Sequence, residues 1–134
     1  MRPKSIVQFE RVVLLSIAIG IVQSILYWDH ATAAANARGF GPGVLFGAQL
    51  FGIAIYLLLL WFIARQGSFM ARGIYVVLTI IGVAMSLFGL GQVETVPLIF
   101  TIVQALLSLI SIWLLFRPDA NAWFSQRYLS VDPE

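Results

Sequence analysis

The sequence predicts an all-α membrane protein: an antiparallel up-down-up-down bundle of four transmembrane helices with short interfacial helices at both ends. Of its 134 residues, 60% are hydrophobic and only 10% are charged, whereas soluble domains carry roughly 25% charge. Four apolar stretches occupy residues 9–28, 43–63, 72–90 and 96–116, each close to the roughly 20 residues that a spanning helix needs. Because these stretches and their short links use nearly the whole chain, we expect a single integral membrane domain over residues 1–134.

The basic residues predict which side of the membrane the termini face. If all four stretches span, seven of the eight basic residues lie on the side of both termini and only Arg38 lies on the other. The seven are Arg2, Lys4, Arg11, Arg65, Arg72, Arg117 and Arg127. Cytoplasmic loops favour Lys and Arg, so we expect both termini in the cytoplasm. Such a rim suits anionic lipid headgroups, and nucleic acid is not an expected partner.

Both ends of the chain carry helix signals. Ser5 and Gln8 fit a capping box after Pro3, so a short interfacial turn is expected to lead into the first span. In the tail, Pro118 and Asp119 suit the first turn of an interfacial helix over residues 118–129. Its aromatic residues share one face, which is typical of a membrane anchor or a partner-docking helix.

The loops predict where the first helix ends and how the spans are connected. Residues 31–37 are alanine-rich and are expected to extend the first helix, until the glycines of residues 39–43 break it. Ala31-Thr32-Ala33 also fits a signal-peptide cleavage site, but Gln23 and the bulky Trp28 favour a retained span. The short links make neighbours of consecutive spans.

Small and polar residues recur at helical spacing on every span, which predicts the faces that meet. These residues are Ser16, Gly20, Gln23 and Tyr27; Ala48, Gly52 and Tyr56; Thr79, Gly82, Ser86 and Gly89; and Thr101, Gln104, Ser108 and Ser111.

Three amides stand out because an unpaired amide in hydrocarbon costs several kcal/mol. Gln23, Gln49 and Gln104 fall in the outer halves of their spans, and with Thr101 and Ser108 they form a candidate polar seam. Hydrogen bonds that hold the helices together are the commoner arrangement, at about 0.6–2 kcal/mol each. The alternative is a polar pocket that opens to the outside.

Catalytic signals are sparse. No ionisable residue lies in the middle of a span, which argues against a proton-coupled pump. The chain has no cysteine and no recognisable nucleotide or hydrolase motif, so we expect neither a cofactor nor a metal. On the outer side, Asp29, His30 and Glu94 are weak candidates for a metal or acid–base site.

The two ends resemble those of small bacterial inner-membrane proteins with four spans, whose function is not known. The likeness lies in Arg2-Pro3-Lys4-Ser5-Ile6 with Phe9-Glu10, and in Trp113 with Phe116-Arg117-Pro118-Asp119-Ala120 and Ala122-Trp123-Phe124. It implies a bacterial inner-membrane address and a cytoplasmic collar, in which the N-terminal turn docks against the tail. The collar comprises Arg2, Lys4, Glu10, Arg117, Asp119, Trp123 and Phe124.

These patterns favour a non-enzymatic small membrane protein that binds a membrane partner, a lipid or itself. An alternative is an oligomeric channel or facilitator for a small neutral solute, which would use the glutamine-lined seam. A further alternative is a membrane enzyme at the outer surface. A four-helix monomer has little interior volume, so transport would require a homo-oligomer.

Overall fold

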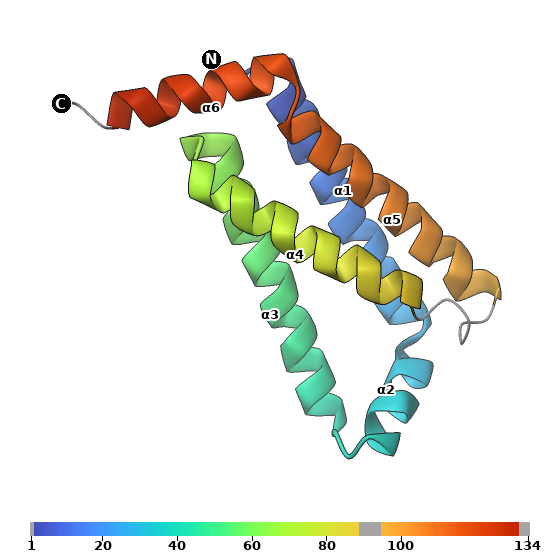
Figure 1. Ribbon diagram of the computed structural model, residues 1–134. Coiled ribbons are helices and arrows are strands. Elements are labelled where there is room, and N and C mark those ends of the chain that lie inside the picture. Colours follow the sequence, from blue (N-terminus) through green and yellow to red (C-terminus); the bar gives the residue numbers. More distant parts are fainter. Residues whose placement is uncertain (1, 89–94, 132–134) are drawn as a thin grey trace.

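The computed structural model describes residues 2–88 and 95–131, and over that part the protein is an all-helical, multi-pass membrane bundle. Figure 1 shows long helices that alternate in direction, with α6 lying across one end of them. The elements are α1 (Lys4–Leu26), α2 (Trp28–Ala37), α3 (Pro42–Trp61), the π-helical η1 (Phe62–Gln66), α4 (Phe69–Phe88), α5 (Thr95–Leu115) and α6 (Pro118–Val131). Four segments are long and apolar enough to cross a membrane: Lys4–Leu26, Pro42–Gln66, Phe69–Phe88 and Leu98–Leu115.

Local backbone chemistry sets the helix ends. Pro42 opens α3 at a first-turn position, where its missing N–H costs nothing. Gly67 ends η1 in the left-handed region, with φ 63° and ψ 35°, which favours glycine. Ser68 then caps α4 by accepting a hydrogen bond from the backbone N–H of Ala71 at 3.2 Å.

The structure corrects several expected boundaries. The capping box is wrong: Pro3 is the N-cap of α1 and makes no side-chain cap bond, while Ser5 lies buried inside the helix. The expected N-terminal interfacial turn is therefore continuous with the first span. Residues 31–37 do not extend the first helix, because the chain leaves helical geometry at Tyr27 and restarts as α2. Residues 89 and 90 of the expected third span lie outside the described residues.

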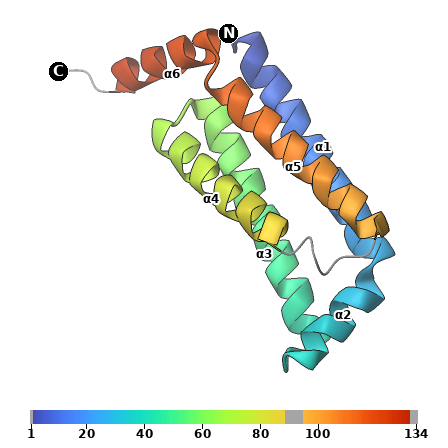
Figure 2. The same ribbon diagram turned by 45° about the vertical axis from the view of Figure 1, so that its right-hand side comes forward.

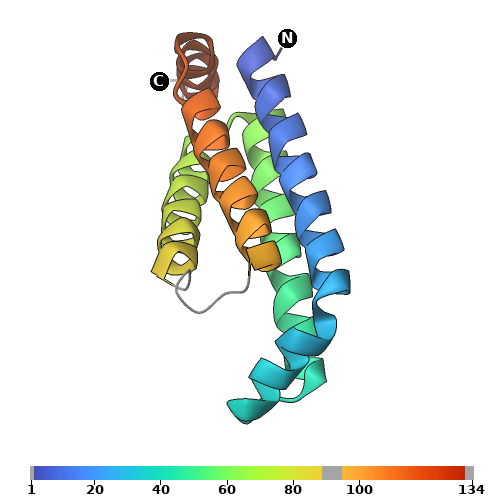
Figure 3. The same ribbon diagram turned by 90° about the vertical axis from the view of Figure 1, so that its right-hand side faces the viewer.

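Packing is strongest between the first and the last span. Helices α1 and α5 lie side by side in all three views (Figures 1, 2 and 3), and they form the most extensive contact between elements. The first two spans, α1 and α3, contact each other only sparsely, and the short helix α2 connects them (Figure 2). These two spans, which were expected to be neighbours, are thus only loosely packed against each other.

The apolar core lies at one end of the bundle. We call this the collar end; it holds the start of α1, η1 and α6, and the opposite end is the α2 end (Figure 3). The fully buried large side chains gather at the collar end: Ile6, Phe9, Ile63, Leu115 and Phe124. Toward the α2 end, Ile25 and Phe46 remain exposed in the bundle, where lipid would surround them.

Candidate functional site

A polar cavity of about 220 Å³ lies between the four spans. Polar side chains from every span line it: Ser16 of α1, Tyr56 of α3, Tyr75 and Thr79 of α4, and Gln104, Ser108 and Ser111 of α5. None of the described residues that line it carries a charge. The cavity therefore offers neutral hydrogen-bonding groups in the interior of a membrane protein.

Gln104 joins α5 to α1 at one wall of the cavity. Its side-chain oxygen accepts a hydrogen bond from the Ser16 hydroxyl, and its Nε2 donates to the Ser16 backbone oxygen at 2.9 Å. A Cβ on Gly20 would lie 3.4 Å from the same Nε2, so the glycine gives Gln104 room to approach α1. This amide is satisfied and holds the helices together.

Tyr75 separates the cavity from the collar end. Its hydroxyl lies 2.7 Å from Ser111 Oγ, which links α4 to α5. Its ring meets Phe9 edge-on, with ring centroids 5.1 Å apart. Phe9 belongs to the buried core, so packed rings close the cavity on this side.

Thr79 lines the cavity without being satisfied. Its side chain is buried, at 4% exposure, and its hydroxyl lies near the Tyr75 hydroxyl but makes no hydrogen bond of normal distance and angle within the described part of the chain. An unpaired buried polar group costs about 1–3 kcal/mol, and native structures fill such positions with ordered water or another polar partner. Thr79 thus marks a position where a bound polar molecule would be stabilised.

A second cavity, of about 260 Å³, continues the first toward the α2 end. The two share Tyr56, Thr79, Gln104 and Ser108 as lining residues. The second also reaches Gln23 and Thr101. The polar space therefore extends from the middle of the bundle into its outer half.

The structure brings together four of the five predicted seam residues. Gln23, Thr101, Gln104 and Ser108 all line the second cavity. Gln49 does not: its Nε2 donates to Ser24 Oγ across the gap between α1 and α3.

Sequence reasoning missed the role of three further residues, Tyr56, Tyr75 and Thr79. Tyr56 and Thr79 stood on the predicted small-residue faces, and Tyr75 lies one helical turn before Thr79. The helical spacing of these residues could have predicted a shared face, but the predicted seam was based on the glutamines.

At the collar end, Asp119 of α6 docks onto the first turn of α1. The Ser5 hydroxyl donates to Asp119 Oδ1 at 2.7 Å, and the Ser5 backbone N–H donates to Oδ2 at 3.2 Å. The hydrogen bond from the Ser5 hydroxyl lowers the pKa of Asp119 below its usual value. The N-terminal turn and the tail helix are in direct contact, as the resemblance implied.

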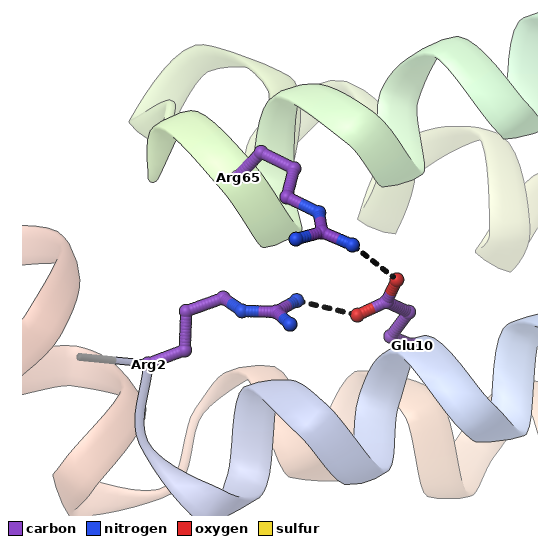
Figure 4. A network of polar contacts seen from close by, with 3 residues as sticks. All are labelled: Arg2, Glu10 and Arg65. Carbon is purple, nitrogen blue, oxygen red and sulfur yellow. Dashed lines mark hydrogen bonds and ion pairs between the residues drawn. The ribbon is translucent and has the colours of Figure 1, made fainter.

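Glu10 accepts two guanidinium groups (Figure 4). Arg2 Nη1 lies 2.5 Å from Glu10 Oε2, and Arg65 Nη2 lies 3.6 Å from Oε1. Arg2 and Glu10 were both expected in the collar, whereas Arg65 was not. The cluster ties the start of α1 to η1.

Arg72 is a collar residue that sequence reasoning did not single out. Its guanidinium lies between the rings of Phe69, Phe116 and Phe124, at 5.1, 4.7 and 4.8 Å from their centroids. Its Nη1 also donates to the backbone oxygen of Leu115, the last residue of α5, at 3.3 Å and to Asn121 Oδ1 at 2.8 Å. These contacts join α4, α5 and α6.

The remaining collar residues divide into a buried set and an exposed set. Trp123 and Phe124 are buried against the bundle, so they are not free to receive a partner. Lys4 is exposed, and Arg117 lies over the Trp113 ring, 5.0 Å from its centroid.

The outer-surface candidates are not brought together in the described structure. Asp29 and His30 are exposed in the first turn of α2, and Glu94 lies outside the described residues. No group of three or more His, Asp or Glu side chains that could hold a metal occurs among residues 2–88 and 95–131.

Comparisons of the chain with protein-family models, with curated proteins and with solved structures give no match. The proposals below therefore rest on the residues and geometry described above.

Proposed function

We propose that the protein is a non-enzymatic membrane protein that binds a neutral molecule, with a small hydrogen-bonding group of that molecule held in the polar cavity between its spans. The buried, unpaired Thr79 hydroxyl carries this proposal. A ligand oxygen or nitrogen at that position would pair a group that otherwise bears a desolvation cost.

The lining favours an uncharged ligand. A charged molecule in the membrane interior requires a paired charge, and the polar side chains in the described lining of both cavities are all uncharged hydroxyls and amides. The two cavities, of about 220 and 260 Å³, share lining residues, and each is below the roughly 300 Å³ of the smallest drug-sized sites. The polar group that binds in either cavity is therefore small.

The closed collar end favours a binding pocket over an open pore. Phe9 and Tyr75 pack between the cavity and the collar, and Ile6 and Ile63 are fully buried beyond them. A facilitator that uses the glutamines of the predicted seam remains the second candidate. It would have to separate these side chains in each transport cycle.

We place the protein in a bacterial inner membrane with both termini in the cytoplasm, on the strength of the basic bias and the resemblance of its ends. Protease protection of terminal tags in intact cells tests this orientation. The collar residues Glu10 and Asp119 are engaged by internal contacts. Lys4 of the collar and nearby Arg11 are exposed on one face of α1. Those two cations support contact with anionic lipid headgroups.

Thr79→Val tests the ligand pocket, because it removes the hydroxyl and keeps the side-chain shape. Native mass spectrometry of the protein extracted in its own lipid should reveal a stoichiometric bound species. We expect Thr79→Val to reduce its occupancy, with about a tenfold loss of affinity for one lost hydrogen bond.

Thr32→Val is the matched control, since Thr32 lies in α2 and lines neither polar cavity. Equal retention in both variants, or no bound species in the unaltered protein, would contradict the proposal.

A further inference from the structure

An apolar groove of about 570 Å³ runs between α1 and α3 beside the polar cavities. Its walls include Ile21 and Ile25 of α1 and Leu50 and Ile53 of α3. Ile25 is 72% exposed and Leu50 is 52% exposed in the bundle. Because both helices are membrane spans, the groove lies at the depth of lipid hydrocarbon.

The groove adjoins polar groups on its inner side. A neighbouring space of about 420 Å³ shares Ile21, Ser24, Gln49 and Ile53 with the groove and adds Gln23 and Tyr27. Gln23 also lines the second polar cavity. An unbroken set of lining residues therefore leads from the lipid-facing groove to Thr79.

One hydrogen bond crosses the gap between these two helices. Gln49 Nε2 of α3 donates to Ser24 Oγ of α1, and Ser24 donates in turn to the backbone oxygen of Gly20 at 2.7 Å. Nearer the α2 end, the Trp28 ring of α2 packs against the Phe46 ring of α3, with centroids 6.2 Å apart, and α1 and α3 otherwise contact each other only sparsely. Few contacts therefore join the two spans along the groove.

We infer that the ligand of the proposed pocket is an uncharged single-chain amphiphile that is taken from the bilayer between α1 and α3. Its hydrogen-bonding head lies among Gln23, Tyr56 and Thr79, and its hydrocarbon chain lies in the groove along Ile25 and Leu50. This inference rests on the proposed function and names the chemical class of its ligand.

The two ends of the site carry the inference together. A head with hydroxyl or amide groups matches the neutral polar lining, and a charged head would find no partner in the described lining. A hydrocarbon chain matches the groove, whose polar lining residues are limited to Ser24 and Gln49 apart from the Trp28 ring nitrogen. A ligand that had a polar head and no hydrocarbon chain would leave the groove filled by bilayer lipid.

Binding of 1-monooleoylglycerol to the full-length protein in phosphatidylcholine nanodiscs tests this inference. Leu50→Trp fills the groove without touching the polar cavities. Leu109→Trp is the matched control, because Leu109 is 54% exposed and lines none of the cavities described above. We expect Leu50→Trp to weaken binding by about tenfold and Leu109→Trp to leave it unchanged.

A second groove variant and the pocket variant, Thr79→Val, distinguish failure of the groove site from failure of the pocket. Ile25→Trp acts from the opposite wall and should reproduce the loss, which covers the case that Leu50→Trp does not fold. If Thr79→Val weakens binding and both groove variants bind normally, the chain site is overturned and the pocket stands. If the probe binds and no variant affects its binding, both sites are overturned. If the probe does not bind, the amphiphile is overturned, and the comparison of Thr79→Val with Thr32→Val by native mass spectrometry decides the pocket separately.

Discussion

At the scale of single residues, some hydroxyl-bearing side chains join helices, whereas the buried Thr79 hydroxyl joins none within residues 2–88 and 95–131. Ser16 and Ser111 bond to Gln104 and Tyr75, respectively, and so join helices. Thr79 has no such partner among the described residues. That difference separates structural polar contacts from the candidate ligand site.

The Ser5–Asp119 contact predicts a pH-dependent contribution to stability. The pKa of Asp119 is lowered in the folded protein, so this contribution is fully present above its unfolded value of 3.8 and is lost as pH falls through the lower folded value. Ser5→Ala removes the main cause of the shift. We expect it to lower the melting temperature at pH 7, and to lower it by less at pH 3.

Thermal denaturation in detergent at the two pH values measures this effect. Ser125→Ala is the control, because Ser125 is an exposed serine of α6, the helix that carries Asp119, and this change should have no effect. An equal drop for Ser5→Ala at pH 7 and pH 3 would show that the carboxylate does not contribute.

Residue roles were only partly predictable from the sequence. The sequence placed Glu10 and Arg2 in one collar, but it did not place there Arg65, which also contacts Glu10. Gln49 was placed in the seam because its depth suited it, yet it bonds to Ser24. Depth in a span follows from sequence, whereas the neighbouring helix that a side chain meets depends on tertiary packing.

At the scale of elements, the positions of the spans and of the tail helix follow from hydropathy and proline placement. The expected tail helix over 118–129 corresponds to α6 (Pro118–Val131). The break at Tyr27 and the π-helical η1 did not follow from the sequence, because no glycine or proline marks the first and a π-turn has no simple composition signal.

The turn at Gly67 predicts a backbone effect on stability. Its φ of 63° suits glycine, so Gly67→Ala should lower the unfolding free energy by about 1 kcal/mol. Gly73→Ala is the matched control, because a Cβ there meets no atom within 4 Å and alanine favours the helix. Denaturant unfolding should move the two variants in opposite directions; a shift in the same direction would contradict this account of the turn.

At the scale of the whole molecule, the bundle is tightly packed at the collar end and loosely packed at the α2 end. Ion pairs, the Ser5–Asp119 contact and the apolar core all lie at the collar end. The alternating bundle followed from four hydrophobic stretches, but the gap between α1 and α3 did not. Hydropathy predicts the number of spans, but it does not predict the distance between two spans.

The central claim is that Thr79 faces a cavity that small molecules can reach, and cysteine labelling tests it most directly. The chain has no cysteine, so Thr79→Cys and Ala71→Cys each introduce a single thiol on α4. The two positions are almost equally buried, at 4% and 6% exposure, but Ala71 lies at the collar end and lines neither polar cavity.

With methyl methanethiosulfonate, a small neutral reagent, we expect Thr79→Cys in nanodiscs to react severalfold faster than Ala71→Cys. Equal rates, or a faster reaction at Ala71→Cys, would contradict the account of an accessible polar pocket.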